Sequence, residues 1–206
     1  MTGVQTCALP ISVAAVVVVK VKMVPAIPAP LDMQRYIGAK MTKELTLRLY
    51  ESQDIPRIIK LICLAIPQLP NYKMIVPSEE RIQYVLEHNI DNAVSFAGWV
   101  LCDTHNQVHG FGGGWCVGNL MSYDLVADDI FMWIEPEYRN YTNVSKLVNT
   151  FVAWAKGKGA KLIRATHSAG SFPKGSKEAA LYHALLERLG FVEVGSIYHW
   201  SGYGEH

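Results

Sequence analysis

The sequence predicts an α/β fold, with one mixed, mostly antiparallel sheet and helices on both of its faces. Segments with the two-residue period of strands alternate with segments of helical period along residues 41–206. In the middle of this region, a polar turn separates two apolar strand-like runs, which is typical of a hairpin. After the hairpin, strands and helices alternate singly, which favours βα units on a sheet covered from both sides.

The composition indicates an ordinary globular protein. The 206 residues are 50% apolar, and their formal net charge is +1. Such a balance argues against binding through a basic surface, so we expect no nucleic-acid partner. We also expect no membrane partner, because no apolar run is long enough to span a bilayer. Four cysteines without a CxxC pair predict neither a zinc framework nor a disulfide scaffold, which fits a cytoplasmic location.

The N-terminal segment differs from the rest of the chain. Residues 1–40 combine an apolar run at 13–19 with closely spaced prolines that would interrupt a helix or strand. Residues 1–12 resemble a translated sequencing adapter, so we interpret the segment as an artefactual or disordered extension. A short secretory signal is the alternative, although no Lys or Arg precedes the apolar run. We expect a single domain at residues 41–206.

The first half of this domain is predicted to contain a strand and two helices. Leucines alternate with other side chains over residues 45–50, which predicts the strand. Asp54 and Pro56 are typical of a helix start, and isoleucines at helical spacing follow them. The run Pro-Ser-Glu-Glu at 77–80 opens a second helix with one apolar face.

The second half is predicted to form the hairpin and the elements that follow it. The hairpin strands are expected at 93–102 and 108–117, and a short apolar run at 130–134 predicts a central strand. A strongly amphipathic helix is expected over 144–155, where glycines follow its last turn. The remaining elements are a strand at 161–165, a helix at 177–189 and two closing strands at 192–195 and 197–200.

Three fragments carry a family resemblance. Residues 100–112 look like a central hairpin, and Trp-Ile-Glu-Pro-Glu-Tyr-Arg at 133–139 resembles a V-x-P-x-x-R strand end. Leu-Glu-Arg-Leu-Gly-Phe at 186–191 resembles Y-E-x-L-G-F. In this order and spacing, the chain resembles the GCN5-related N-acetyltransferase (GNAT) family over roughly residues 45–200. The resemblance implies the acyl-CoA N-acyltransferase fold, with acetyl-CoA as co-substrate. It also implies direct attack by a small-molecule or protein amine.

The resemblance places the CoA pyrophosphate at the loop and helix start from Arg139 to Ser145. Converging N–H groups at a helix N-terminus suit a dianion. The family has glycines where this chain has Thr142 and Val144, which alters the approach of a phosphate. The alternative is an ordinary capped helix without a ligand. The residues assigned to the cofactor are Ile134, for the pantetheine arm, and Arg139, Asn140, Tyr141, Thr142, Asn143, Val144 and Ser145.

The acceptor ammonium must lose a proton before it can attack, so a base is needed. The family often uses an acid on the strand before the loop. Asp128 lies six residues before Ile134 and is predicted to share its strand face. A solvated turn at Asp128 and Asp129 is the alternative structure. The alternative bases are Asp124, Asp129, Glu135 and His167.

The departing thiolate needs a proton, and the family often supplies it from a tyrosine on the last helix. That position is Leu186 here, and Tyr182, one turn earlier, is the predicted replacement. Tyr182 as a packing residue is the alternative. These departures leave a second hypothesis: a catalytically degenerate protein of the same fold that binds CoA or another partner. The sequence leaves homodimer formation open.

We expect no metal site, because His105 and His109 lie four residues apart in a hairpin rather than on a helix. The glycine-rich run at 110–114 has no phosphate-loop spacing and predicts a bulge or a close backbone approach. Three lysines are candidates for the CoA 3′-phosphate or for a solvated surface, namely Lys161, Lys174 and Lys177.

Overall fold

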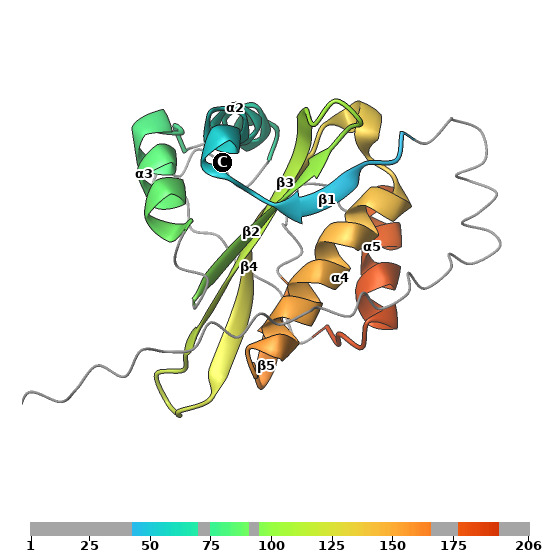
Figure 1. Ribbon diagram of the computed structural model, residues 1–206. Coiled ribbons are helices and arrows are strands. Elements are labelled where there is room, and N and C mark those ends of the chain that lie inside the picture. The colour runs from blue at the N-terminus through green and yellow to red at the C-terminus, as the bar shows by residue number, and fades with distance from the viewer. Residues whose placement is uncertain (1–42, 70–74, 91–94, 166–176, 194–206) are drawn as a thin grey trace, which may run out of the picture.

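A computed structural model describes residues 43–69, 75–90, 95–165 and 177–193 of the chain (Figure 1). In these residues, five strands form one sheet in the order β1-β2-β3-β4-β5. The pairs β1–β2, β2–β3 and β3–β4 are antiparallel, and β5 joins β4 in parallel. The predicted fold class is therefore confirmed. The strands are β1 (Thr46–Leu49), β2 (Phe96–Cys102), β3 (Val108–Gly118), β4 (Leu125–Ile134) and β5 (Leu162–Arg164).

Helices cover both faces of this sheet, with α2 and α3 on one side and α4 and α5 on the other (Figure 1). No helix in the described part of the chain is long and apolar enough to cross a membrane. The helices are α2 (Ile55–Ala65), α3 (Glu79–Asn89), α4 (Tyr141–Gly157) and α5 (Lys177–Arg188), with short 3₁₀ turns η1 (Ser52–Asp54), η2 (Ile66–Gln68) and η4 (Pro136–Tyr138).

The predicted hairpin is confirmed as β2 and β3. Strand β4 begins at Leu125 rather than at residue 130, because pairing with β3 continues through the two aspartates that interrupt the apolar run. Cross-strand hydrogen bonds keep Asp128 and Asp129 in the strand, although two adjacent aspartates alone favour a turn. Of the two predicted closing strands, Val192 and Glu193 are not in a strand, and the remainder lies outside the described residues.

The sheet separates two hydrophobic cores. Because successive side chains of a strand point to opposite faces, Leu101 faces α4 and α5 whereas Val100 faces α2 and α3. The side chains that α4 contributes to the first core repeat at helical spacing, as predicted. They are Leu147, Val148, Phe151, Val152 and Ala155.

A glycine permits close contact between β3 and α4. A Cβ atom at Gly114 would meet the ring of Phe151, a side chain that is only 3% exposed. We therefore expect Gly114→Ala to lower the free energy of unfolding by about 1–3 kcal/mol in urea denaturation. Gly118→Ala in the same strand, with no atom within 4 Å of the added Cβ, should change it by less than about 0.5 kcal/mol. Equal stability of the two variants would contradict this packing.

Candidate active site

Strand β4 extends beyond its partner β5. The parallel pairing aligns Val126 with Leu162 and ends where Asp128 meets Arg164. From there to Ile134, β4 has no β5 partner among the described residues. The unpaired edge of a strand presents N–H and C=O groups that a bound chain can use. Helix α4 starts shortly after β4 ends, so its N-terminus lies at the same end of the sheet as the last residues of β4 (Figure 1).

A β-bulge interrupts the regular alternation of β4. Phe131 pairs with Gly113 and Asp129 pairs with Gly114, so Ile130 is an extra residue with no partner in β3. One extra residue shifts the alternation of side chains by one position. Two residues of β4 that lie an even number of positions apart, one before the bulge and one after it, therefore face opposite sides of the sheet.

The bulge changes the placement of the candidate base. Asp128 lies opposite Trp115, which packs against the α2/α3 core. Ile134 packs in the α4/α5 core. The prediction that Asp128 and Ile134 share a strand face is therefore wrong, because Ile130 lies between them as an inserted residue. Asp128 instead faces the side of α2 and α3.

Asp128 lies within β4 and not in a solvated turn. Arg164 of β5 donates two hydrogen bonds to it, Nε to Oδ1 at 2.5 Å and Nη2 to Oδ2 at 2.7 Å. The hydrogen bonds and the charge of Asp128 raise the pKa of Arg164. This bidentate geometry fixes the orientation of the carboxylate, which stays partly exposed.

Asp129 and Tyr182 lie on the opposite side of the sheet, toward α4 and α5. Asp129 is 8% exposed and pairs with Gly114, whose position faces Phe151. Tyr182 of α5 is buried in the same core. Burial raises the pKa of Tyr182, and the charge of Asp129 raises it further. The phenol therefore keeps its proton well above neutral pH.

The first turn of α4 is capped by its own sequence. The Asn140 side chain accepts a hydrogen bond from the N–H of Asn143 at 2.9 Å. The N–H groups of Tyr141 and Thr142 have no acceptor within the helix, as in any first turn. Val144 packs partly against the α4/α5 core. The predicted loop is thus a capped helix start that still offers N–H groups to an anion.

Asn143 is turned into the protein. It is fully buried, and its Oδ1 accepts from the N–H of Leu45 at 3.1 Å. Its Nδ2 donates to the carbonyl oxygens of Lys43 and Tyr138 at 3.0 and 2.8 Å. This side chain joins the start of α4 to the segment that enters β1. Its amide atoms are used within the protein.

Two buried polar atoms near this turn have no hydrogen-bond partner within the described part of the chain, Nη2 of Arg139 and Oγ of Ser145. Nε of Arg139 donates to the carbonyl of Ile134 at 2.7 Å, and its guanidinium lies 4.0 Å from the centre of the Trp133 ring. Burial lowers the pKa of Arg139. Unpaired buried donors are costly, and a ligand oxygen would satisfy them. These residues therefore fit an anionic group.

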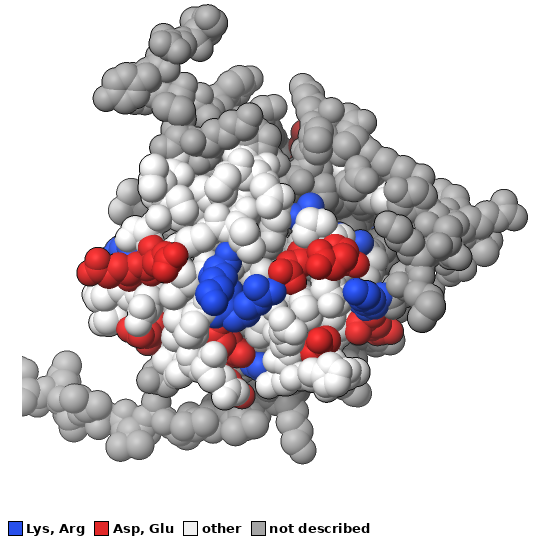
Figure 2. Space-filling model, turned by 90° about the horizontal axis from the view of Figure 1, so that it is seen from above, with Lys and Arg blue, Asp and Glu red and all other residues white. Residues whose placement is uncertain are grey.

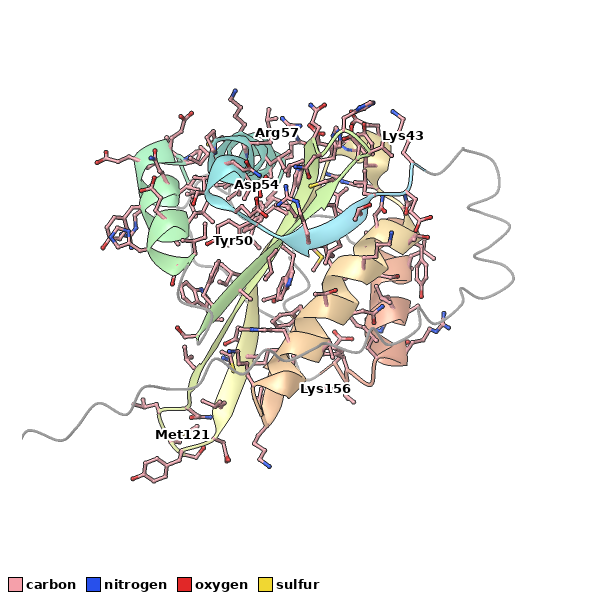
Figure 3. The ribbon with its side chains drawn as sticks, viewed as in Figure 1. Lys43, Tyr50, Asp54, Arg57, Met121 and Lys156 are labelled. Carbon is pink, nitrogen blue, oxygen red and sulfur yellow. The ribbon has the colours of Figure 1, made fainter. Side chains whose placement is uncertain are left out.

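A charged network adjoins the same end of the sheet. Arg57 of α2 donates to Glu135 at 2.7 Å, and Glu135 lies 2.7 Å from Nδ1 of His109. Nε2 of His109 lies 3.3 Å from Asp103, and the ring stacks on Tyr138 with centroids 3.9 Å apart. Figure 2 shows basic and acidic side chains side by side on the surface seen from above, and Figure 3 shows Arg57 on α2. Glu135, an alternative base in the sequence, is thus held by two partners.

The predicted cofactor residues come together, since Ile134 and residues 139–145 lie at one end of β4 and the start of α4. Asp128 lies apart from them, closer to the start of β4 and on the other face of the sheet. Arg164 and Trp115 carry no local signal in the sequence, because only the register across three strands places them beside Asp128. The other candidates are the exposed Lys161, Lys177 at the start of α5, Asp124 at the β3–β4 turn, and His167 and Lys174, which lie outside the described residues.

No family model and no curated protein matches the chain. Among solved structures, a Trypanosoma brucei acetyltransferase has a TM-score of 0.57 at 14% identity, covering 77% of this chain and 99% of that one. Glucosamine-6-phosphate N-acetyltransferase from Arabidopsis thaliana has a TM-score of 0.56 at 12% identity, with coverages of 76% and 97%. An aminoglycoside N-acetyltransferase in complex with CoA has a TM-score of 0.54 at 14% identity, with coverages of 77% and 94%. The chain therefore has the GNAT acetyltransferase fold.

Proposed function

We propose that the protein transfers an acetyl group from acetyl-CoA to an amine, carried by a small molecule or by a protein. The observation that carries the proposal is the end of the β4–β5 pairing at Asp128 within the described residues, with the N-terminus of α4 close to the end of β4. Acetyl-CoA supplies an activated thioester, which gives its acetyl group to nitrogen and leaves as a thiol. The acetyltransferases of the same fold support this reaction class at low identity.

The residues around the start of α4 would hold the cofactor's pyrophosphate. The N–H groups of Tyr141 and Thr142 and the positive end of the helix dipole would contact it. Ser145 Oγ and Arg139 Nη2 are the buried donors that it would satisfy. The unpaired edge of β4 up to Ile134 would hydrogen-bond the amide groups of the pantetheine arm. Asn140 and Asn143 would shape this site without contacting the ligand, since their side chains bind within the protein.

Asp128 and Tyr182 would move the two protons of the reaction. Asp128 accepts a proton from the acceptor ammonium, directly or through water, and frees the lone pair that forms the N–C bond. The C–S bond breaks, and the sulfur takes a proton from Tyr182 or from water. Asp128 faces α2 and α3 and Tyr182 faces α4 and α5, so the two groups would act from opposite sides of the sheet.

Tyr182→Phe should lower kcat by about tenfold, less than the loss usual for a missing general acid, because a thiolate can take its proton from water. The ring keeps its packing, so the variant should remain folded at the assay temperature. Steady-state kinetics with thiol detection measures the effect. A kcat equal to that of the wild type would assign Tyr182 to packing alone.

A second candidate function is binding of CoA without catalysis. Two observations favour it. The Asn140 side chain already binds the N–H of Asn143, and Leu186 lies in the core where the family has a tyrosine. Such a protein would bind acetyl-CoA and leave the thioester intact.

The experiment that separates the two functions measures thiol release from acetyl-CoA with a panel of amines, together with mass spectrometry of the products. We expect thiol release that depends on the amine and equals the amount of N-acetylated product. Cofactor binding without release, with every amine in the panel, would favour the non-catalytic function. Neither binding nor release would refute both.

A further inference from the structure

Four side chains form a row across the α2/α3 face of the sheet. The strand register aligns Phe96 of β2 with Trp115 of β3, Trp115 with Asp128 of β4, and Asp128 with Arg164 of β5. Residues directly opposite one another on antiparallel strands point to the same face, with Cβ atoms about 4.5–5.5 Å apart. Two aromatic rings, a carboxylate and a guanidinium are therefore neighbours at the last described pair of β4 and β5.

Apart from Arg164, the neighbours of Asp128 that the strands place on this face are apolar. The rings of Phe96 and Trp115 pack with centroids 4.8 Å apart, and Trp115 is only half-buried. Further along β4, the half-buried Phe131 packs against the α2/α3 core. A hydrophobic or aromatic group beside the carboxylate would therefore bury apolar surface and contact an aromatic ring.

The charged side chains that the strands place on this face can bind one cation. Asp128 is the one carboxylate that the described residues of β2, β3 and β4 place here, because Asp129 faces the other core. Arg164 occupies one site on each oxygen of Asp128, and a carboxylate has about four such sites. A single ammonium can use the remainder. A second positive charge would meet Arg164.

We propose that the acceptor is a monocationic amine with an apolar, aromatic body, of the 2-arylethylamine class. Its ring would contact Trp115, and its ammonium would bind Asp128. This inference rests on the proposed acetyl transfer. In that reaction the ammonium gives one proton to Asp128, and the freed lone pair forms the N–C bond as the C–S bond breaks. The nitrogen then releases a second proton to water, and the sulfur takes a proton from Tyr182 or from water and leaves as a thiol. A polycationic amino-sugar would find a single carboxylate from the described residues of β2, β3 and β4, with an arginine beside it, and its hydroxyl groups would face apolar side chains.

The test compares 2-phenylethylamine with kanamycin in two assays, binding to the full chain by calorimetry and thiol release from acetyl-CoA. We expect 2-phenylethylamine to bind at least tenfold more tightly and to have at least a tenfold higher kcat/KM. Trp115→Leu should weaken its binding about tenfold, and Trp115→Phe should restore most of it, because the second variant keeps an aromatic ring. Glu187→Gln on the exposed surface of α5 is the matched control and should bind as the wild type does.

The outcomes separate this inference from the proposed function. Acetylation of kanamycin in preference to 2-phenylethylamine would overturn the acceptor class and leave acetyl transfer standing. Binding of 2-phenylethylamine without thiol release would support the acceptor class and count against catalysis. Equal binding of 2-phenylethylamine by wild type and Trp115→Leu, with both variants folded by circular dichroism, would also overturn the inference.

Discussion

Asn143→Ala should lower the free energy of unfolding by about 3–5 kcal/mol. The fully buried amide makes three hydrogen bonds to the main chain at Lys43, Leu45 and Tyr138. Each buried group left without a partner costs about 1–3 kcal/mol, and a small cavity adds to the loss. Domains of this kind are stable by about 5–15 kcal/mol, so the variant would lose a large share of its stability. Urea denaturation measures the change.

Asn149→Ala is the matched control, since this asparagine lies half-buried in the middle of the same helix. Its unfolding free energy should stay within about 1 kcal/mol of the wild type. A stable Asn143→Ala variant with strongly weakened acetyl-CoA binding would contradict the structural role. That result would support the prediction from the sequence that Asn143 contacts the cofactor.

Asp128→Asn should lower kcat/KM for the amine by about a hundredfold or more, with the dissociation constant of acetyl-CoA unchanged. The amide has nearly the same shape, but it cannot accept the ammonium proton, and general-base catalysis contributes about 10²–10⁴-fold. Steady-state measurement of thiol release gives kcat/KM, and calorimetry gives the dissociation constant of acetyl-CoA. A lower kcat/KM with unchanged affinity for acetyl-CoA would show that Asp128 acts on the acceptor amine and does not bind the cofactor.

Asp124→Asn removes a neighbouring carboxylate near the exposed β3–β4 turn, whose tip carries Met121, and should leave turnover unchanged (Figure 3). Asp129→Asn probes the opposite face of the sheet. Wild-type activity in Asp128→Asn, together with a large loss in Asp129→Asn, would transfer the base to the side of Tyr182.

Local patterns in the sequence predict the elements of this fold well. Helix α4 follows from the apolar spacing of Leu147, Val148 and Phe151, and the hairpin follows from two apolar runs around a polar turn. The start of β4 is missed because Asp128 and Asp129 look like a turn when read alone. Their pairing with β3 lies outside any local window, so propensity gives the wrong boundary.

The candidate site is predicted less completely than the fold. Residues 139–145 are found because a motif marks them, but their roles differ from simple expectation. Asn143 and Asn140 serve the protein's own main chain, which is visible only once Leu45 lies beside the helix. The face of Asp128 is mispredicted because Ile130 is an inserted residue, and counting by twos fails across a bulge. Arg164 joins Asp128 through register alone.

The decisive measurement is calorimetric titration of acetyl-CoA into the wild type, Thr142→Glu and Thr142→Gln. A glutamate in the first turn of α4 suits the helix dipole, so folding should be preserved, but its charge would repel a pyrophosphate at the same N–H groups. We predict micromolar binding by the wild type, at least tenfold weaker binding by Thr142→Glu, and near-normal binding by Thr142→Gln. Absence of wild-type binding at millimolar acetyl-CoA, or equal affinity in all three proteins, would contradict a cofactor site at the start of α4.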